Sequence, residues 1–128
     1  MVLFNTNSIG KKELLVNNLI AAELFIQELQ EVIKNNRLVF DPRNGKTNEF
    51  MLEEGLTVED VFLILESLSP KNYYDGPKND RNGKPGIVMM FLFPYKENRR
   101  IYIKLKIWKD RSGKAGVIIS FHEEGNYD

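Results

Sequence analysis

Two stretches near the C-terminus combine an imidazole, a phenol and ammonium groups at alternating positions. The first, "IYIKLKIW", places Tyr102, Lys104, Lys106 and Trp108 at every second position, with isoleucine and leucine between them. The second, "VIISFHEE", carries His122, the only histidine of the chain. Successive side chains of a β-strand point to opposite faces of the sheet. The first stretch therefore predicts a strand with one apolar face and one basic, aromatic face.

The register between the two strands decides whether these groups meet. The second stretch also alternates, and its expected core face is Val117, Ile119 and Phe121, which leaves Ile118, Ser120 and His122 on the open face. We expect a three-residue loop over 111–113, with Gly113 at the left-handed position that such a loop requires. The two apolar faces then coincide. In this register His122 faces Tyr102, and Ser120 faces Lys104.

This set of groups suits the cleavage of a phosphodiester. A base removes the proton of a 2′-hydroxyl, cations stabilise the crowded phosphate, and an acid protonates the leaving oxygen. Imidazole exchanges protons near neutral pH, so we expect His122 to act as the general acid or base. Tyr102 would assist proton transfer or stack on a base, and Lys104 and Lys106 would contact the phosphate. The structural alternative is an amphipathic hairpin that exposes lysine and tyrosine for solubility.

The overall composition bounds the remaining chemistry. A chain of 128 residues that is 42% hydrophobic and 28% charged fits one domain over residues 1–128. The absence of cysteine and the single histidine exclude thiolate and histidine-rich metal sites, and we expect neither a metal nor a cofactor. The start "MVLFNTNSIGKKELL" has no signal-peptide pattern, and no stretch reaches the ~20 apolar residues of a membrane span. We therefore expect a cytoplasmic protein without membrane association.

The net charge of zero hides an uneven distribution of charge along the chain. Residues 71–114 hold twelve Lys or Arg and only four Asp or Glu, a balance of +8, and the remainder of the chain balances at −8. A local positive field attracts phosphates even where the net charge is nil. The alternative is that both sets of charges intermix in the folded chain. Tyr73, Tyr74 and Trp108 add aromatic rings that stack on single-stranded bases.

The pattern of apolar residues predicts helices first and strands afterwards. Apolar residues recur at three- and four-residue steps over 11–35, which predicts one amphipathic helix or a broken pair of helices. Shorter helices are expected over 48–54, ending at Gly55, and from Thr57, whose capping box with Asp60 starts the next helix. A short extended piece, "RLVF", precedes them. Three strand-like runs follow over 87–95, 99–108 and 116–122. This order predicts an α+β fold with N-terminal helices packed on an antiparallel β-meander.

The segment "DGPKNDRNGKPG" separates the helices from the meander. Its twelve residues are mostly turn formers, which is long for a simple connection. It is therefore either a functional loop or a mobile one. Because it carries Lys78, Arg81 and Lys84, we expect it to border the site and to be mobile without RNA.

Three motifs in this order resemble the MqsR family of toxins from bacterial type II toxin–antitoxin systems. They are "LTVEDVFLILESLSPKNYYDGP", "IYIKLKI" and "VIISFHEE", within a resemblance that covers roughly residues 23–124. The resemblance implies a RelE-like fold, metal-independent endonucleolytic cleavage of mRNA and a cognate antitoxin protein.

The same resemblance implies roles for individual residues. Tyr102 and Lys104 match the YxK strand of the family, and His122 follows its SF pair. The tyrosine and Gly-Pro element before the meander is matched by Tyr73, Tyr74, Gly76 and Pro77. Some members carry lysine where this chain has His122 and Asp75. We expect Lys78 to supply the positive charge that such a lysine provides in those members.

The first hypothesis is therefore an mRNA endonuclease that cleaves by 2′-hydroxyl attack with acid/base catalysis. His122, Tyr102 and Lys104 would carry the chemistry. The expected RNA-binding residues are Lys106, Tyr73, Tyr74, Lys78 and Trp108. The rival hypothesis is a non-catalytic RNA- or protein-binding module on the same scaffold, which would need the basic face but not His122.

Overall fold

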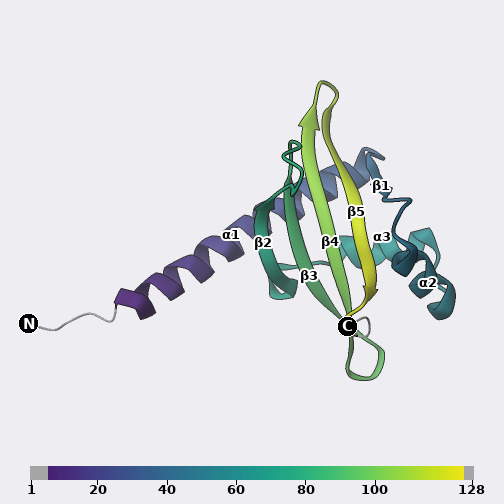
Figure 1. The fold of residues 1–128 in the computed structure, drawn as a ribbon, viewed down its shortest axis with the longest axis horizontal. Coiled ribbons are helices and arrows are strands. Elements are labelled where there is room, and N and C mark those ends of the chain that lie inside the picture. Colours follow the sequence, from purple (N-terminus) through teal and green to yellow (C-terminus); the bar gives the residue numbers. More distant parts are fainter. Residues whose placement is uncertain (1–5, 126–128) are drawn as a thin grey trace, which may run out of the picture.

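A five-stranded mixed sheet with helices on one side forms the α+β fold (Figure 1). The computed structural model describes residues 6–125. The helices are α1 (Thr6–Lys34), α2 (Gly45–Glu54) and α3 (Val58–Glu66), with 3-10 turns at Pro70–Asn72 and Lys96–Asn98. The strands are β1 (Leu38–Phe40), β2 (Tyr73–Asn79), β3 (Ile87–Tyr95), β4 (Arg99–Asp110) and β5 (Gly113–Glu123). The α+β prediction is confirmed.

The predicted long helix is a single unbroken α1. Its inward positions recur at helical spacing and are fully or nearly fully buried: Ala22, Phe25, Ile26, Leu29 and Val32. The N-terminal half of α1 extends past the edge of the sheet (Figure 1). This half carries exposed aliphatic side chains, namely Leu14, Leu15, Val16 and Ile20.

Local capping signals determine the ends of the two short helices. Gly55 ends α2 in the left-handed conformation at φ 67°, as predicted. Thr57 and Asp60 form the predicted capping box, with hydrogen bonds of 3.1 and 2.8 Å between each side chain and the backbone N–H of the other residue. The start of α2 is earlier than predicted, because Asn44 accepts a hydrogen bond from the backbone N–H of Thr47 at 3.1 Å and caps the helix.

The sheet has the strand order β1-β5-β4-β3-β2. The predicted antiparallel meander is confirmed for β3, β4 and β5, and β2 extends it antiparallel at one edge. At the other edge β1 runs parallel to β5, a pairing that the sequence did not reveal. The core lies between the sheet and the helices, where Phe25 packs against Phe91 and Phe50 packs against Phe121 with ring centroids 6.0 and 6.1 Å apart.

The turn between β4 and β5 differs from the predicted one. Asp110 pairs with Gly113, so the turn contains two residues and not three. The tighter turn shifts the register by one residue, and Leu105 therefore pairs with Ile118, which is a core residue and only 1% exposed. The prediction that Val117 and Ile119 face the core and Ile118 the open side is wrong.

A β-bulge in β5 restores the predicted register farther along the hairpin. The register shifts between Lys104 and Leu105, where Ile119 is the additional residue of β5. Beyond the bulge Lys104 pairs with Ser120 and Tyr102 pairs with His122, as predicted. The bulge therefore returns the polar side chains to the open face.

The long segment over 75–86 is only partly a loop. Its first five residues belong to β2, an edge strand with two register shifts, and the loop proper begins at Asp80. Turn-forming residues are compatible with this strand because Pro77 lies at a sheet edge, where a missing N–H is tolerated.

Gly76 provides a test of this irregular strand. Its φ is +104°, and an added Cβ would lie 2.9 Å from the backbone oxygen of Val88. We expect Gly76→Ala to lower the free energy of unfolding by about 1–3 kcal/mol, from backbone strain and the contact with β3. Gly45→Ala is the control, because nothing lies within 4 Å of that position. Urea denaturation of both variants measures the difference, and equal midpoints would contradict the expected strain.

Candidate active site

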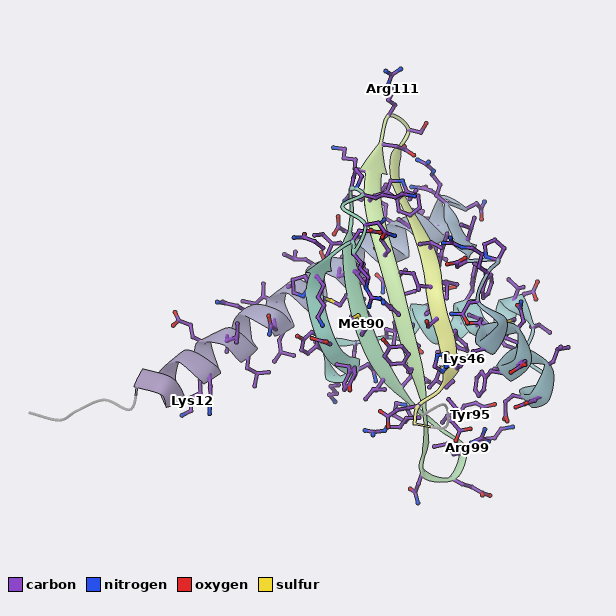
Figure 2. The ribbon with its side chains drawn as sticks, viewed as in Figure 1. Lys12, Lys46, Met90, Tyr95, Arg99 and Arg111 are labelled. Carbon is purple, nitrogen blue, oxygen red and sulfur yellow. The ribbon has the colours of Figure 1, made fainter. Side chains whose placement is uncertain are left out.

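The open face of the sheet brings the predicted catalytic residues together. Tyr102 and His122 are cross-strand neighbours, with ring centroids 5.5 Å apart. Lys104 lies one pair farther along β4, opposite Ser120. Met90 of β3 pairs with Lys104 and belongs to the same face, and Figure 2 shows its position near the middle of the sheet. An imidazole, a phenol and an ammonium group thus share one side of the central strands.

Tyr74 extends this site toward the edge strand. Its ring meets Tyr102 edge-on, with centroids 6.3 Å apart, and it is 55% exposed. Three rings, those of Tyr74, Tyr102 and His122, therefore form a row across the sheet. Exposed aromatic faces of this kind stack on unpaired bases.

A small groove of about 360 Å³ lies beside Tyr102, the central ring of this row. Its lining includes Tyr102, Lys104, Met90, Asp75, Lys78, Asp80 and Arg81. Lys78 forms an ion pair with Asp75 at 2.7 Å. By contrast, Lys104 and Arg81 have no carboxylate partner within the part of the chain that the structure describes. The segment over 75–86 thus borders the site, as expected.

Lys106 lies on the predicted face but is not an exposed cation. Its side chain is 11% exposed, and its Nζ lies 2.6 Å from a carboxylate oxygen of Asp80, itself 17% exposed. The hydrogen bond from Lys106 holds the pKa of Asp80 below its ordinary value. The loop after β2 thus covers Lys106, a contact between distant segments that the alternation of residues could not reveal. The ammonium group that we expected to contact a phosphate is therefore already paired with Asp80.

Two other predicted RNA-binding residues lie away from the small groove. Tyr73 pairs with the buried Phe91 and packs against the core, and its hydroxyl donates a hydrogen bond of 2.5 Å to the carbonyl oxygen of Gly76. The expectation that Tyr73 shapes an RNA surface is therefore not supported by its position. Trp108 is half-buried on the open face, with Nζ of Lys106 5.8 Å from its ring centroid.

Ion pairs offset part of the uneven charge seen in the sequence. Arg99 contacts Glu54 and Glu123, Arg100 contacts Glu124, and Lys114 contacts Glu28 and Glu31. These pairs join the basic segment to the acidic remainder of the chain, so the charges intermix in part. The surplus of positive charge is concentrated where cations remain unpaired, which includes the small groove.

Asn44 and Thr47 are functional-site residues that sequence reasoning missed. The side-chain amide of Asn44 donates hydrogen bonds to the carbonyl oxygen of Ile119 and, at 3.1 Å, to Oγ of Ser120. Thr47, which is buried, accepts a hydrogen bond of 3.0 Å from the backbone N–H of Phe121. The pairing of β5 with β1 ends at Ile118, so the backbone groups of Ile119 and Phe121 on that edge lie beyond the partner strand, and these two side chains satisfy them. The sequence signal that could have identified Asn44 is its place as an N-cap residue directly before a helix.

The contacts of His122 define its tautomer. Nδ1 lies 3.1 Å from the carbonyl oxygen of Glu123. A carbonyl oxygen only accepts hydrogen bonds, so this contact assigns the hydrogen to Nδ1 and the lone pair of the neutral ring to Nε2. The neutral imidazole of His122 can therefore act as a base through Nε2.

Tyr102 is suited to the opposite role. Burial raises the pKa of its phenol above the ordinary tyrosine value, and the nearby Tyr74 and Asp75 raise it further, while Lys78 lowers it. The phenol therefore keeps its proton at neutral pH and can donate it.

No protein-family model, curated protein or solved structure matches the chain. Over the described residues, no group of three or more His, Cys, Asp or Glu could hold a metal ion. None of the helices in residues 6–125 is long and apolar enough to cross a membrane.

Substitution of Asn44 tests whether α2 positions the site. Asn44→Ala removes a helix cap, worth about 0.5–2 kcal/mol, and leaves the oxygen of Ile119 without its partner. Thr57→Ala removes a comparable cap from α3, away from β5, and is the matched control. We expect the NMR chemical shifts of the His122 ring to differ from those of the unaltered protein in Asn44→Ala and to be the same in Thr57→Ala. Unchanged His122 shifts in both variants would show that the cap does not position the imidazole.

Titration of Tyr102 tests whether burial raises the pKa of its phenol. The absorbance difference between the protein and Tyr102→Phe isolates this phenol, and we expect its midpoint above the ordinary tyrosine value. The raised pKa means that the protonated phenol of Tyr102 stabilises the folded state. This contribution to the free energy of unfolding is complete below the pKa of tyrosine in the unfolded chain, and it is lost as the pH rises through the pKa of Tyr102 in the folded protein. A midpoint at or below the ordinary value would contradict the burial of the phenol.

Proposed function

We propose that this chain is an mRNA endonuclease, the toxin of a type II toxin–antitoxin system, with a RelE-like α+β fold. The observation that carries the proposal is the placement of His122, Tyr102 and Lys104 on neighbouring strands of one open face. The three side chains supply a base, a proton donor and a cation, which phosphodiester cleavage requires. The resemblance of the sequence motifs to the MqsR family supports the same conclusion.

The mechanism follows from the hydrogen-bond contact of His122 and from the raised pKa of Tyr102. Nε2 of His122 removes the proton of a ribose 2′-hydroxyl, and the resulting oxygen attacks the adjacent phosphorus. The bond from phosphorus to the 5′-oxygen breaks as the bond to the 2′-oxygen forms, giving a 2′,3′-cyclic phosphate. Tyr102 protonates the departing 5′-oxygen. Lys104 stabilises the charge that accumulates on the non-bridging phosphate oxygens.

The surroundings of these residues are consistent with single-stranded RNA as the substrate. Tyr74 offers an exposed ring beside Tyr102 for a neighbouring base. Arg81 lines the same small groove as Lys104 and adds positive charge for the backbone. Lys78 is shared with Asp75, so its contribution to phosphate binding requires that this pair rearrange.

The toxin assignment also implies a partner and a location. A cognate antitoxin protein would inhibit the enzyme by covering the open face, where the unpaired cations and the catalytic side chains lie together. Because the substrate is mRNA, the site of action would be the cytoplasm.

Cleavage and binding by variants of the catalytic residues test the proposal. We expect His122→Ala to lower cleavage of a labelled RNA by about 10²–10⁴-fold in the presence of EDTA, because the base is lost. RNA affinity should be nearly unchanged. Lys104→Ala should weaken both cleavage and binding, and it should reduce the salt dependence of binding by about one phosphate contact. Lys12→Ala, which alters an exposed lysine on the projecting half of α1 (Figure 2), is the matched control.

The same measurements separate the nuclease from the rival function. If His122→Ala cleaves as fast as the unaltered protein, the imidazole has no catalytic role. If the unaltered protein binds RNA through Lys104 but cleaves none, the chain is a non-catalytic RNA-binding module.

A further inference from the structure

A second and larger hollow adjoins the small groove on the open face. This large pocket has a volume of about 850 Å³ and lies between the segment over 39–43, the loop over 80–85 and strands β4 and β5. Asp80, Asn82 and Ile119 line both hollows. The two hollows are therefore neighbouring parts of one surface.

The surface of the large pocket is partly apolar and aromatic. Val39 of β1 faces it and is 56% exposed, and Trp108 contributes a half-buried indole. Val117 and Ile119, which the sequence had assigned to the core, line it because of the shifted register of β5. The pocket thus combines an indole with aliphatic side chains, a surface suited to a flat apolar ring.

The rim of the large pocket carries a surplus of positive charge. Asp41 and Asp110 are neutralised by ion pairs with Arg43 and Arg37. Lys84 and Lys109 line the pocket and form no ion pair with any residue that the structure describes. An aromatic floor with unpaired cations at its rim matches a nucleobase flanked by phosphates.

Trp108 of the large pocket is too far from Tyr102 to contact the nucleotides at the scissile bond. Trp108 lies six residues after Tyr102 on the same face of β4. At ~3.3–3.4 Å per residue, this separation is about 20 Å. Only an RNA strand that continues beyond the cleaved bond reaches both places.

We propose that the large pocket is a base-binding subsite for the RNA strand that is cleaved at His122. An unpaired nucleobase stacks on Trp108 and contacts Val39 and Val117, while Lys84 and Lys109 hold the adjacent phosphates. The identity of the ligand as RNA rests on the proposed function. The subsite selects substrates that extend as a single strand on one side of the scissile bond.

Two substrates of different length test the subsite. For a single-stranded oligoribonucleotide long enough to span about 20 Å, we expect Trp108→Ala to raise KM by about 5- to 150-fold, the range for one base–aromatic stack. For a dinucleoside monophosphate, which occupies only the scissile position, the same variant should leave kcat/KM unchanged. Trp108→Phe should recover most of the affinity. Equal losses on both substrates, or no loss on either, would overturn the subsite.

A pair of valine variants separates the pocket from general damage to the fold. Val39→Asp places a carboxylate in the pocket and should weaken binding of the long RNA by repulsion of its phosphates. Val58→Asp alters another exposed valine, 47% exposed at the start of α3, and should have no effect. Indistinguishable RNA affinities for the two variants would argue against occupancy of the pocket.

Fluorescence provides a measurement that does not depend on cleavage. Trp108 is the only tryptophan of the chain, so its emission reports on this pocket. We expect the oligoribonucleotide to quench it in the His122→Ala variant, and inorganic polyphosphate, which has no bases, to leave it unchanged. Quenching without any cleavage by the unaltered protein would refute the nuclease and retain the subsite. Cleavage without quenching, or equal quenching by polyphosphate, would refute base binding.

Discussion

The bulge in β5 is the constraint on which the open face depends. A two-residue turn sets the register near Asp110, and if that register continued, Phe121 would oppose Tyr102 and His122 would oppose Ile101 on the core side. The additional residue Ile119 shifts the register back by one, so that His122 opposes Tyr102 and Phe121 opposes Ile103. The backbone groups of β5 that lie beyond the end of β1 are satisfied by Asn44 and Thr47, so the start of α2 and the strand that carries the imidazole are stabilised by the same hydrogen bonds.

Pairing of charges determines where the molecule attracts anions. The carboxylates that line the small groove and the large pocket, Asp41, Asp75, Asp80 and Asp110, all have cationic partners. The unpaired cations on the same surface therefore act without local compensation, although the net charge of the chain is zero. The contact between Asp80 and Lys106 has a further consequence, because it fixes the loop after β2 at the boundary between the two hollows.

Periodicity and capping chemistry were sufficient for the elements of the fold but not for all of their neighbours. The long helix, the caps at Gly55 and Thr57 and the three strands of the meander follow from local sequence, because each depends on side-chain spacing or on a contact within four residues. The parallel pairing of β1 with β5 joins segments nearly eighty residues apart along the chain. No local pattern encodes that pairing, and the short strand 38–40 has too few residues to show alternation.

For the candidate site, the sequence by itself determined that Tyr102, Lys104 and His122 share a face, since alternation along two adjacent strands requires only a matching register. It did not determine the route to that register, because a two-residue turn with a bulge and a three-residue turn without one bring the same residues opposite each other. Only the tertiary structure decided that Lys106 is covered by Asp80, that Tyr73 packs inward and that Asn44 supports the bulge. Each of these depends on the packing of separate segments, where distance in space is unrelated to distance along the chain.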